Sequence, residues 1–536
     1  MIAMGAFVLL LAGPSPALSA STGGDFNGDG RSDLAVGVVF EDVSGVVNAG
    51  AVNVLVGGPS GLRTRGGRFL HRGLAGMAGG GPETNANFGT GLASGDFNGD
   101  GHDDLAVGVP GEGGGSFVGP GAVNVIYGSG KGLTLKGDRR FSQDTPGMAG
   151  DGSDGGDLFG YALAAGDFDG DGRDDLAISA PSETAGGPPA AEQGAVTVLY
   201  GSRKGLRTKG SRFFGSNSPG LQGRWGEDGD RFGLSLAAGD FDRDGRDDLA
   251  VGAPSADIAA MDDGAVGVLY GSHHGLRAKR SNLLSQSSAG IIGDGGEDGD
   301  QFGAALAAGD FDADGRDDLA IGVQFEDVAS TSSAGAVTVV SGSPHGLSPD
   351  RSSLFTQSTA GMAGDGAEVN DAFGARLAAG RFNAGPRIDL AIGARGEDVP
   401  PLPSTGEGAV NVLYGSDNGL RTNGSQFLHQ GNLGIPGENP EQGDEFGDAL
   451  GAGDFDGKGP DDLVVGVPLE DLPAVDANPN DGVIDLIPGG VGSLNPGSTR
   501  EISQATPGVA NAPEPNDFFG ASLAPPDGAV LTNVFD

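Results

Sequence analysis

The sequence contains no cysteine, and only one tryptophan and five tyrosines among 536 residues. Without cysteine, no disulfide can staple the fold and no thiol can act as a nucleophile. The six histidines form no His-Glu-x-x-His pair, and the chain has neither a Gly-x-Ser-x-Gly elbow nor a phosphate-binding loop. The chain therefore lacks the motifs of the common hydrolases and nucleotide-binding enzymes, and we expect it not to be an enzyme.

Basic residues are also scarce, at 31 against 73 acidic ones, which gives a formal net charge of -42. A field of that sign repels a phosphate backbone, so we expect no nucleic-acid partner. The acidic residues fit either a solvated surface or a set of metal ligands. Because they are clustered along the chain, we interpret them as a mixture of the two.

Long hydrophobic runs are absent except at the start. The apolar stretch from Ile2 to Ala12 precedes two prolines and the small-residue segment that ends at Ala20. This arrangement resembles a signal peptide and is too short to cross a bilayer. We therefore expect residues 1–20 to be a signal peptide, residues 21–536 to be one secreted or extracellular domain, and no segment to span a membrane.

What the sequence does contain is a repeat. Seven Phe-Gly pairs are separated by 71, 73, 70, 71, 73 and 73 residues, at Phe88, Phe159, Phe232, Phe302, Phe373, Phe446 and Phe519. Each unit holds short apolar runs bounded by Gly, Asp and Pro, which predicts about four short strands and no helices. A four-stranded sheet buries both faces only by packing against neighbours in a ring.

We therefore predict an all-β, seven-bladed β-propeller of four-stranded blades. An open β-solenoid is the alternative, but its rungs are usually shorter than about 30 residues. The chain ends favour a closed ring: the first Asp-rich loop has no Phe-Gly segment before it, and Phe519 has no such loop after it. We expect a strand at 518–524 to pair with a strand at 34–39, which would remove an exposed sheet edge.

Each unit also carries the pattern Asp-x-Asp/Asn-x-Asp-Gly-x-x-Asp. Calcium takes about six to eight hard oxygen ligands, and oxygens at positions 1, 3 and 5 converge only where a glycine at position 6 permits a tight bend. Position 7 would offer its backbone carbonyl, and the aspartate at position 9 would close the site. The predicted calcium ligands are Asp25, Asn27, Asp29, Arg31 and Asp33; Asp96, Asn98, Asp100, His102 and Asp104; Asp167, Asp169, Asp171, Arg173 and Asp175; Asp240, Asp242, Asp244, Arg246 and Asp248; and Asp310, Asp312, Asp314, Arg316 and Asp318.

Two units depart from the pattern. The sixth has Arg381 at position 1 and Gly385 at position 5, so we expect no ion there. The seventh keeps Asp454, Asp456 and Asp462 but has Lys458 at position 5, which leaves at most a weaker sixth site. The alternative interpretation, that these aspartates and glycines only form turns, is hard to reconcile with five loops at a regular period. We expect five calcium ions.

A Phe-Gly pair, an Asp-rich loop and then a Gly-Ala-Pro segment, intact at Gly252-Ala253-Pro254, resemble the FG-GAP repeat of the integrin α-chain N-terminal β-propeller and of bacterial secreted proteins. The resemblance implies calcium in the loops between the first and second strands of each blade. It also implies that partners meet the opposite face, at the loops 111–119, 182–193, 255–263, 324–334, 395–407 and 469–481.

We therefore expect a monomeric, secreted, calcium-binding module for cell adhesion that binds an extracellular protein or glycan. The alternative is a hydrolase or lyase with its active site in the central channel. That activity would need histidine, arginine or carboxylates on the inner strands, where this sequence has small apolar segments such as Leu236-Ala237-Ala238.

Overall fold

The computed structural model describes residues 24–115, 119–150, 152–184, 192–215, 218–222, 229–399, 406–434, 440–472, 480–514 and 516–524. The expected signal peptide, residues 1–20, lies outside the described residues. The predicted partner-facing loops at 111–119, 182–193, 395–407 and 469–481 are described only in part.

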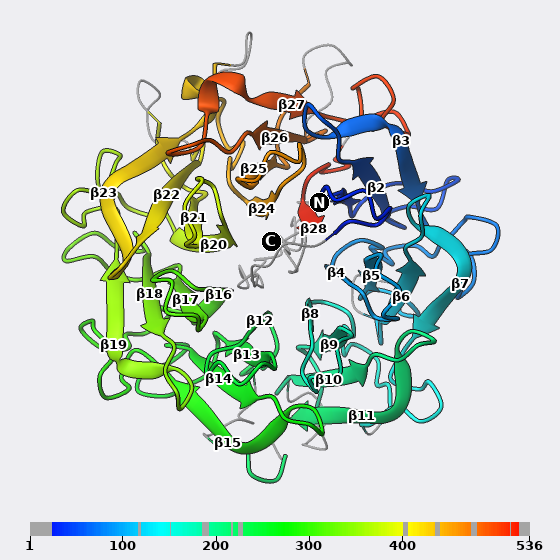
Figure 1. Cartoon of the computed structure of the whole chain (residues 1–536), viewed down its shortest axis with the longest axis horizontal. Helices are drawn as coiled ribbons and strands as arrows, with labels where there is room; N and C mark the ends of the chain where they lie inside the picture. The colour runs from blue at the N-terminus through cyan, green and yellow to red at the C-terminus, as the bar shows by residue number, and fades with distance from the viewer. Residues whose placement is uncertain are drawn as a thin grey trace, which may run out of the picture.

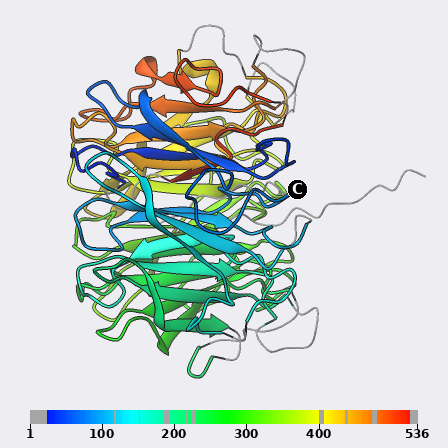
Figure 2. The same cartoon turned by 90° about the vertical axis from the view of Figure 1, so that its right-hand side faces the viewer.

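Seven four-stranded antiparallel sheets stand around a common axis, as the prediction required (Figure 1). Figure 2 shows that the strands cross the thickness of a disc, with loops on both of its faces. Blade one contains β28, β1, β2 and β3, and blades two to seven follow in chain order from β4–β7 to β24–β27.

The innermost strands are β28 (Ser522–Ala524), β4 (Leu92–Gly95), β8 (Leu163–Gly166), β12 (Ser235–Gly239), β16 (Phe302–Gly309), β20 (Phe373–Gly380) and β24 (Ala449–Gly453). The second strands are β1 (Leu34–Val38), β5 (Asp104–Val109), β9 (Asp175–Ala180), β13 (Asp248–Ala253), β17 (Asp318–Val323), β21 (Asp389–Ala394) and β25 (Asp462–Val467). The third strands are β2 (Ala51–Val56), β6 (Ala122–Tyr127), β10 (Ala195–Tyr200), β14 (Ala265–Tyr270), β18 (Ala336–Ser341), β22 (Ala409–Ser416) and β26 (Val483–Ile487).

The outermost strands are β3 (Arg63–Leu70), β7 (Thr134–Phe141), β11 (Arg207–Gly215), β15 (Arg277–Leu284), β19 (Ser348–Phe355), β23 (Gly419–Leu428) and β27 (Arg500–Ile502). Two short 3-10 turns, η1 (Gln430–Asn432) and η2 (Pro496–Ser498), are the helical elements of the described chain.

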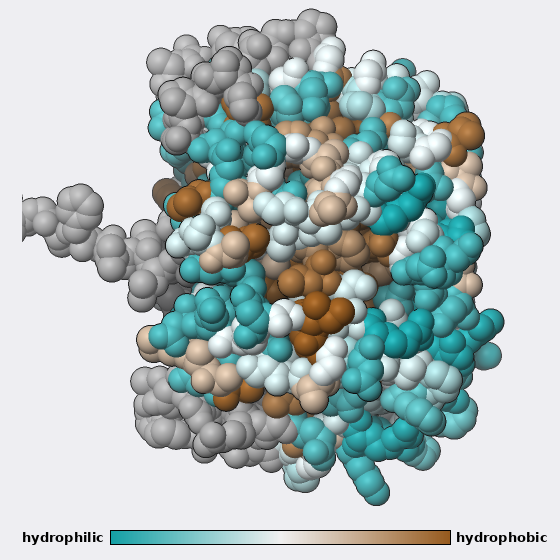
Figure 3. All heavy atoms as spheres, turned by 90° about the vertical axis from the view of Figure 1, so that its left-hand side faces the viewer, coloured by the Kyte–Doolittle hydropathy of each residue, from teal (hydrophilic) through white to brown (hydrophobic). Residues whose placement is uncertain are grey.

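Burial falls from the axis to the rim, and the sequence of each strand follows that gradient. Every residue of the inner strand β12 and of the second strand β13 is buried, whereas the outermost β15 is mostly exposed or half-buried. Small residues on the inner strands let the blades meet near the axis, and Val, Leu and Ile fill the wider space between blades. On the side of blades five and six, hydrophobic residues gather near the middle of the surface, and hydrophilic residues cover much of the rest (Figure 3).

The Phe-Gly pairs mark the start of each inner strand. All seven phenylalanines are fully buried. The glycine after each one has φ between 91° and 105°, a region that side chains with a Cβ rarely adopt. At Gly89 an added Cβ would also lie 2.8 Å from the Ala51 carbonyl oxygen, so the repeat needs glycine for both reasons.

The ring closes through the two ends of the described chain, as predicted. The last strand, β28, pairs antiparallel with β1 and joins Ser522 to Gly37, Leu523 to Val36 and Ala524 to Ala35. Blade one therefore combines one C-terminal strand with three N-terminal ones.

Candidate metal centres

The Asp-rich segments form a set of loops that connect the first strand to the second in blades two to seven and that precede the second strand, β1, in blade one. We number them as loops one to seven: 25–33, 96–104, 167–175, 240–248, 310–318, 381–389 and 454–462. In loops one to five and in loop seven, the aspartate at position 1 accepts hydrogen bonds from the backbone N–H groups of positions 5 and 6, at 2.6–3.0 Å. This carboxylate folds the loop into the compact turn that brings the other oxygens together.

Three of the five predicted sites gather three carboxylates whose oxygens lie within 4.8 Å of one another. They are Asp167, Asp169 and Asp175 in loop three; Asp240, Asp242 and Asp248 in loop four; and Asp310, Asp312 and Asp314 in loop five. Hard oxygen ligands at this density, without nitrogen or sulfur, match calcium better than zinc.

Loops one and two have asparagine at position 3, and there the arrangement differs. The Asn27 amide nitrogen donates to both oxygens of Asp33, at 3.2 and 3.0 Å, and Asn98 binds Asp104 in the same way. A cation at these loops needs the amide oxygen turned inward, which requires only a rotation of the amide group.

The aspartate at position 9 is the most buried ligand of each loop. One of its oxygens accepts the N–H of a glycine that follows the third strand, as Gly201 donates to Asp175 at 2.8 Å. Burial, more than neighbouring carboxylates, raises the pKa of Asp175 to about 9 and that of Asp104 to about 8. The other Asp175 oxygen is buried and has no hydrogen-bond partner. A divalent cation fits this donor set, because its charge would offset the cost of burying an ionised carboxylate.

The side chain at position 7 has a role that the sequence did not indicate. In loops one to five it pairs with the aspartate at position 5 of its own loop, as Arg173 pairs with Asp171 at 2.8 Å and Arg246 with Asp244 at 2.6 Å. The position 5 carboxylate lies outside the cluster of three in loops three and four, whereas Asp314 of loop five, which is paired in the same way, belongs to its cluster. The position 7 carbonyl remains a predicted ligand.

The aspartate at position 8 was also missed. In five loops its carboxylate accepts the position 1 N–H of the preceding blade's loop at 2.6–2.9 Å; these residues are Asp103, Asp174, Asp247, Asp317 and Asp461. The backbone N–H of position 8 donates back to the position 1 carbonyl in all seven loops, and Ser32 closes the circle onto Asp454 at 3.1 Å. The repeated Asp-Asp pair was the available signal. The position 8 backbone connects all seven loops into one ring, and in five of them the carboxylate of this aspartate adds a second contact.

The two divergent loops differ from each other. In loop six, the Arg381 guanidinium donates to the Gly459 carbonyl of loop seven at 2.9 Å, so it bridges two blades. In loop seven, the ammonium of Lys458 forms an ion pair with Asp456 at the place where a calcium ion would neutralise that carboxylate.

A second ring of buried acidic residues lies among the loops of the opposite face, which the sequence analysis did not identify. A glutamate after the second strand accepts from a glutamine 40 residues earlier in four blades: Gln143–Glu183, Gln286–Glu326, Gln357–Glu397 and Gln430–Glu470. Glu112 accepts from an arginine, Arg72, instead. Glu41 accepts from Gln504, across the seam where the two ends of the described chain meet. These pairs connect adjacent blades on the face that was predicted to meet partners.

The inner strands are not uniformly apolar, contrary to the expectation from the sequence. Arg376 in β20 forms an ion pair with Asp448, just before β24, and their side chains are 1% and 4% exposed. Both groups are closed off from solvent, so the pair connects blades six and seven and does not form an open polar site.

The FG-GAP repeat family matches residues 17–55, 88–126, 159–199, 232–269 and 302–340. These segments contain the five loops that keep the full set of predicted ligands, and loops six and seven lie outside them. The family match and the ligand pattern therefore separate the same five blades from the other two.

Two groups of curated proteins are similar to parts of the chain. Phosphatidylinositol-glycan-specific phospholipase D of Rattus norvegicus is 34% identical over 221 residues, 41% of this chain and 24% of that protein. Integrin alpha-PS5 of Drosophila melanogaster is 37% identical over 171 residues, 31% of this chain and 15% of that protein. The chain thus spans at most about a quarter of the length of these relatives.

Among solved structures, the exotype rhamnogalacturonan lyase YesX aligns over 90% of this chain and 75% of its own, at 11% identity and a TM-score of 0.35. A likeness this weak carries no argument about function. Within the described part of the chain, no helix is long and apolar enough to cross a membrane.

Proposed function

We propose that this chain, an FG-GAP repeat protein that resembles the propeller of integrin α chains, is a secreted, calcium-loaded module. In this proposal it binds an extracellular protein or glycan with the face opposite its metal loops. The observation that carries the proposal is the clustering of three carboxylates within 4.8 Å in loops three, four and five. Loops one and two would hold two further ions by the same backbone turn.

Calcium would act here as a structural ion. Each loop is bonded to the next through positions 1 and 8, so an ion that fixes one loop also fixes its neighbour. Ions that bind the folded state stabilise it by linkage. The opposite face then becomes a rigid platform for its longer loops.

A hollow on that opposite face supports a binding role. A cavity of about 450 Å³ lies at the seam of the ring, between the loop after β1 and the segment before β28. Phe40 and Phe518 meet edge to face at 5.3 Å in its wall, and Asp42, Glu514 and Asp517 give it an acidic rim. Aromatic rings beside carboxylates suit both sugar faces and basic peptide segments.

The test is binding of the purified chain to arrays of defined glycans and of extracellular matrix proteins, in calcium and in chelator. We expect one class of ligand to bind in calcium, and we expect Asp42→Arg to weaken that binding at least tenfold. Asp350→Arg, an exposed change on the outermost strand β19, serves as the matched control and should bind normally. Equal binding by both variants would contradict the proposed face.

Elemental analysis addresses the metal separately. About five calcium ions per chain support the proposal, and no bound metal after dialysis against calcium would contradict it.

A further inference from the structure

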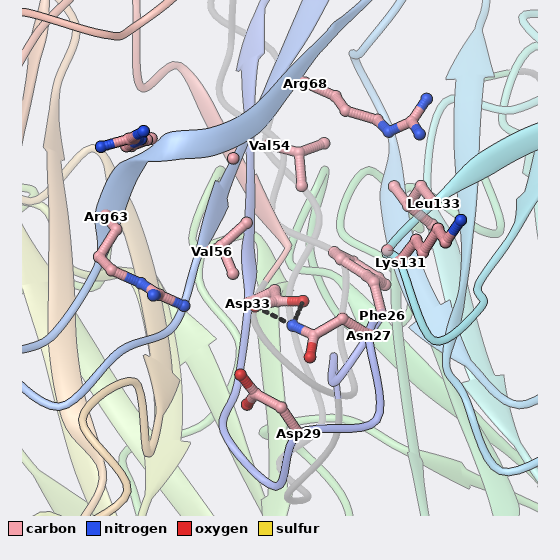
Figure 4. Close-up of a pocket in the computed structure, with 13 residues that line it drawn as sticks. Phe26, Asn27, Asp29, Asp33, Val54, Val56, Arg63, Arg68, Lys131 and Leu133 are labelled. Carbon is pink, nitrogen blue, oxygen red and sulfur yellow. Dashed lines mark hydrogen bonds between the residues drawn. The ribbon is translucent and has the colours of Figure 1, made fainter.

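A cavity of about 270 Å³ lies between blades one and two, on the outer side of loop one. Phe26, Val54, Val56 and Leu133 form an apolar wall, and Arg63, Arg65, Arg68 and Lys131 surround it together with Asn27, Asp29 and Asp33 of the loop. Figure 4 shows Arg63 on one side and Lys131 on the other, with Val56 and Phe26 between them.

In four other blades the same space holds a tyrosine. The last residue of β6, β10 and β14 is a tyrosine, and Tyr414 occupies the same register in β22. Three of these hydroxyls accept a backbone N–H from the next blade: Tyr200 from Leu276 at 3.1 Å, Tyr270 from Leu347 at 3.3 Å and Tyr414 from Leu494 at 3.0 Å. In blade one this position is Val56, which pairs with Arg63 as Tyr200 pairs with Arg207.

The glycine that faces each tyrosine shows that the space is open in blade one. A Cβ added at Gly205, Gly275 or Gly346 would lie within 2.0 Å of a tyrosine hydroxyl oxygen. At the corresponding Gly132, a Cβ would meet nothing within 4 Å. The cavity therefore includes the place that a phenol ring occupies in the other blades, beside the backbone of Leu133.

The charge of the cavity also differs from that of the other interfaces. In blades two and three, the arginine that corresponds to Arg68 binds a carbonyl of the next blade, as Arg139 binds Leu206 at 3.1 Å and Arg212 binds His274 at 2.9 Å. The Arg68 side chain is exposed and makes no hydrogen bond or ion pair to any residue that the structure describes. Four cationic side chains against two carboxylates make the cavity positive in a chain of net charge -42.

We infer that this cavity is a binding site for a small phenolic carboxylate. The aromatic ring would fill the space that tyrosine fills in the other blades, and its hydroxyl would accept the N–H of Leu133. The carboxylate would pair with Arg68 and Lys131, since guanidinium groups bind carboxylates with two parallel hydrogen bonds. This site lies outside the opposite face and needs no partner protein, but it borders loop one, whose Asn27, Asp29 and Asp33 belong to the proposed calcium site.

The test uses the whole chain in calcium buffer, with 4-hydroxyphenylacetate as the probe and isothermal titration and ligand-observed NMR as the readouts. We expect saturable binding of one equivalent. Tyrosol, which has the same ring without the carboxylate, should bind about tenfold more weakly, and Arg68→Met should weaken the acid by a similar factor.

Val56→Tyr is the decisive variant, because it supplies the tyrosine that four other blades already contain. It should abolish binding without lowering the melting temperature. Ser341→Tyr makes the matched change at the end of β18 in blade five and should leave binding intact.

Failure of the wild type to bind the probe at millimolar concentration would overturn the inference. Binding that survives Val56→Tyr, or that is lost equally in Ser341→Tyr, would also overturn it. Binding unaffected by Arg68→Met would exclude the carboxylate contact.

Discussion

At the scale of single residues, loop seven shows how little separates a candidate calcium loop from a divergent one. Asp454 accepts the N–H groups of Lys458 and Gly459, each at 2.9 Å, as position 1 does in loops one to five. The backbone turn is therefore already present, and what differs is the ammonium at position 5. Loop six lacks the position 1 carboxylate as well.

Lys458→Asp should therefore add a calcium site. The change removes a positive charge that neutralises Asp456 and supplies the missing carboxylate in a loop that is already folded. We expect one more calcium equivalent than in the wild type, measured by titration or elemental analysis. Gly385→Asp in loop six is the control and should add none, because Arg381 stands at position 1. An unchanged stoichiometry in Lys458→Asp would contradict the ligand assignment.

The buried glutamates of the opposite face give a prediction about pH. Burial, with help from the nearby Asp371 and Asp365, raises the pKa of Glu397 from its ordinary value of 4.5 to about 9. Between these values the folded state holds a proton that the unfolded state has lost, so the free energy of unfolding falls as pH rises. Glu326 and Glu41, each with a pKa raised to about 8, act in the same direction.

Glu397→Gln should flatten this dependence, because glutamine cannot ionise and can still accept from Gln357. Thermal melts from pH 5 to pH 9 should show a smaller fall in melting temperature in the variant than in the wild type. Glu192→Gln is the matched control, since Glu192 is 44% exposed and pairs with Arg231 on the surface. A slope equal to that of the wild type in Glu397→Gln would contradict the prediction.

At the scale of the elements, the contacts between blades are as regular as the blades themselves. The position 8 aspartate of one loop binds the N–H of the loop before it, and the distance along the chain is 77–80 residues. The blades therefore form a chain of hydrogen bonds around the metal face, in addition to the apolar packing between their sheets.

Asp317→Ala should weaken this contact. Asp317 accepts the N–H of Asp240 at 2.9 Å, and its removal leaves that partly buried donor without its acceptor. We expect a loss of about 1–3 kcal/mol in the free energy of unfolding, measured by urea denaturation in calcium. Asp317→Asn keeps an oxygen acceptor and should cost clearly less. Equal losses in the two variants would show that the hydrogen bond is not what matters.

Most of the fold could be predicted from the sequence, because the repeat is strict. The spacing of Phe-Gly pairs gave the number of blades, and the missing half-units at the two ends gave the β28–β1 pairing. The candidate ligand pattern could also be found in the sequence, since its positions lie within nine residues of one another, and metal binding by these residues stays a prediction. The contacts of the position 8 aspartate and the Gln–Glu pairs could not be predicted, because their partners are 40 to 80 residues away and meet only when blades are adjacent.

The cavity beside Val56 was beyond sequence analysis for a related reason. A valine in place of tyrosine at the end of one apolar run is an ordinary change when that run is considered alone. It becomes a cavity only because Gly132 and Leu133 of the next blade face the same space.

At the scale of the whole molecule, ring closure depends on a seam of three residue pairs. Gly37 lies at this seam, where an added Cβ would fall 1.9 Å from the Ser522 side-chain oxygen and 2.7 Å from the Gly89 carbonyl. Gly37→Ala should therefore separate β28 from β1 and lower the melting temperature by several degrees. Gly81→Ala is the control, because a Cβ there meets nothing within 4 Å. Equal melting of the two variants would show that the seam does not limit stability.

Removal of calcium should also lower the stability of the closed ring, because the metal loops connect its blades on one face. We expect chelator to lower the melting temperature and added calcium to restore it, because a bound ion stabilises only the folded state. Differential scanning calorimetry measures both changes. A melt that is unaffected by chelator would contradict a structural role for the metal.

The seam also means that blade one cannot be complete until the C-terminal strand β28 has been synthesised. Gly37 and Ser522 are 485 residues apart in the sequence, so β1 has no inner neighbour until the ribosome reaches the last part of the chain. At synthesis rates of about 5–20 residues per second, that interval lasts on the order of half a minute to more than a minute. Throughout it, the nascent chain presents an unpaired apolar strand.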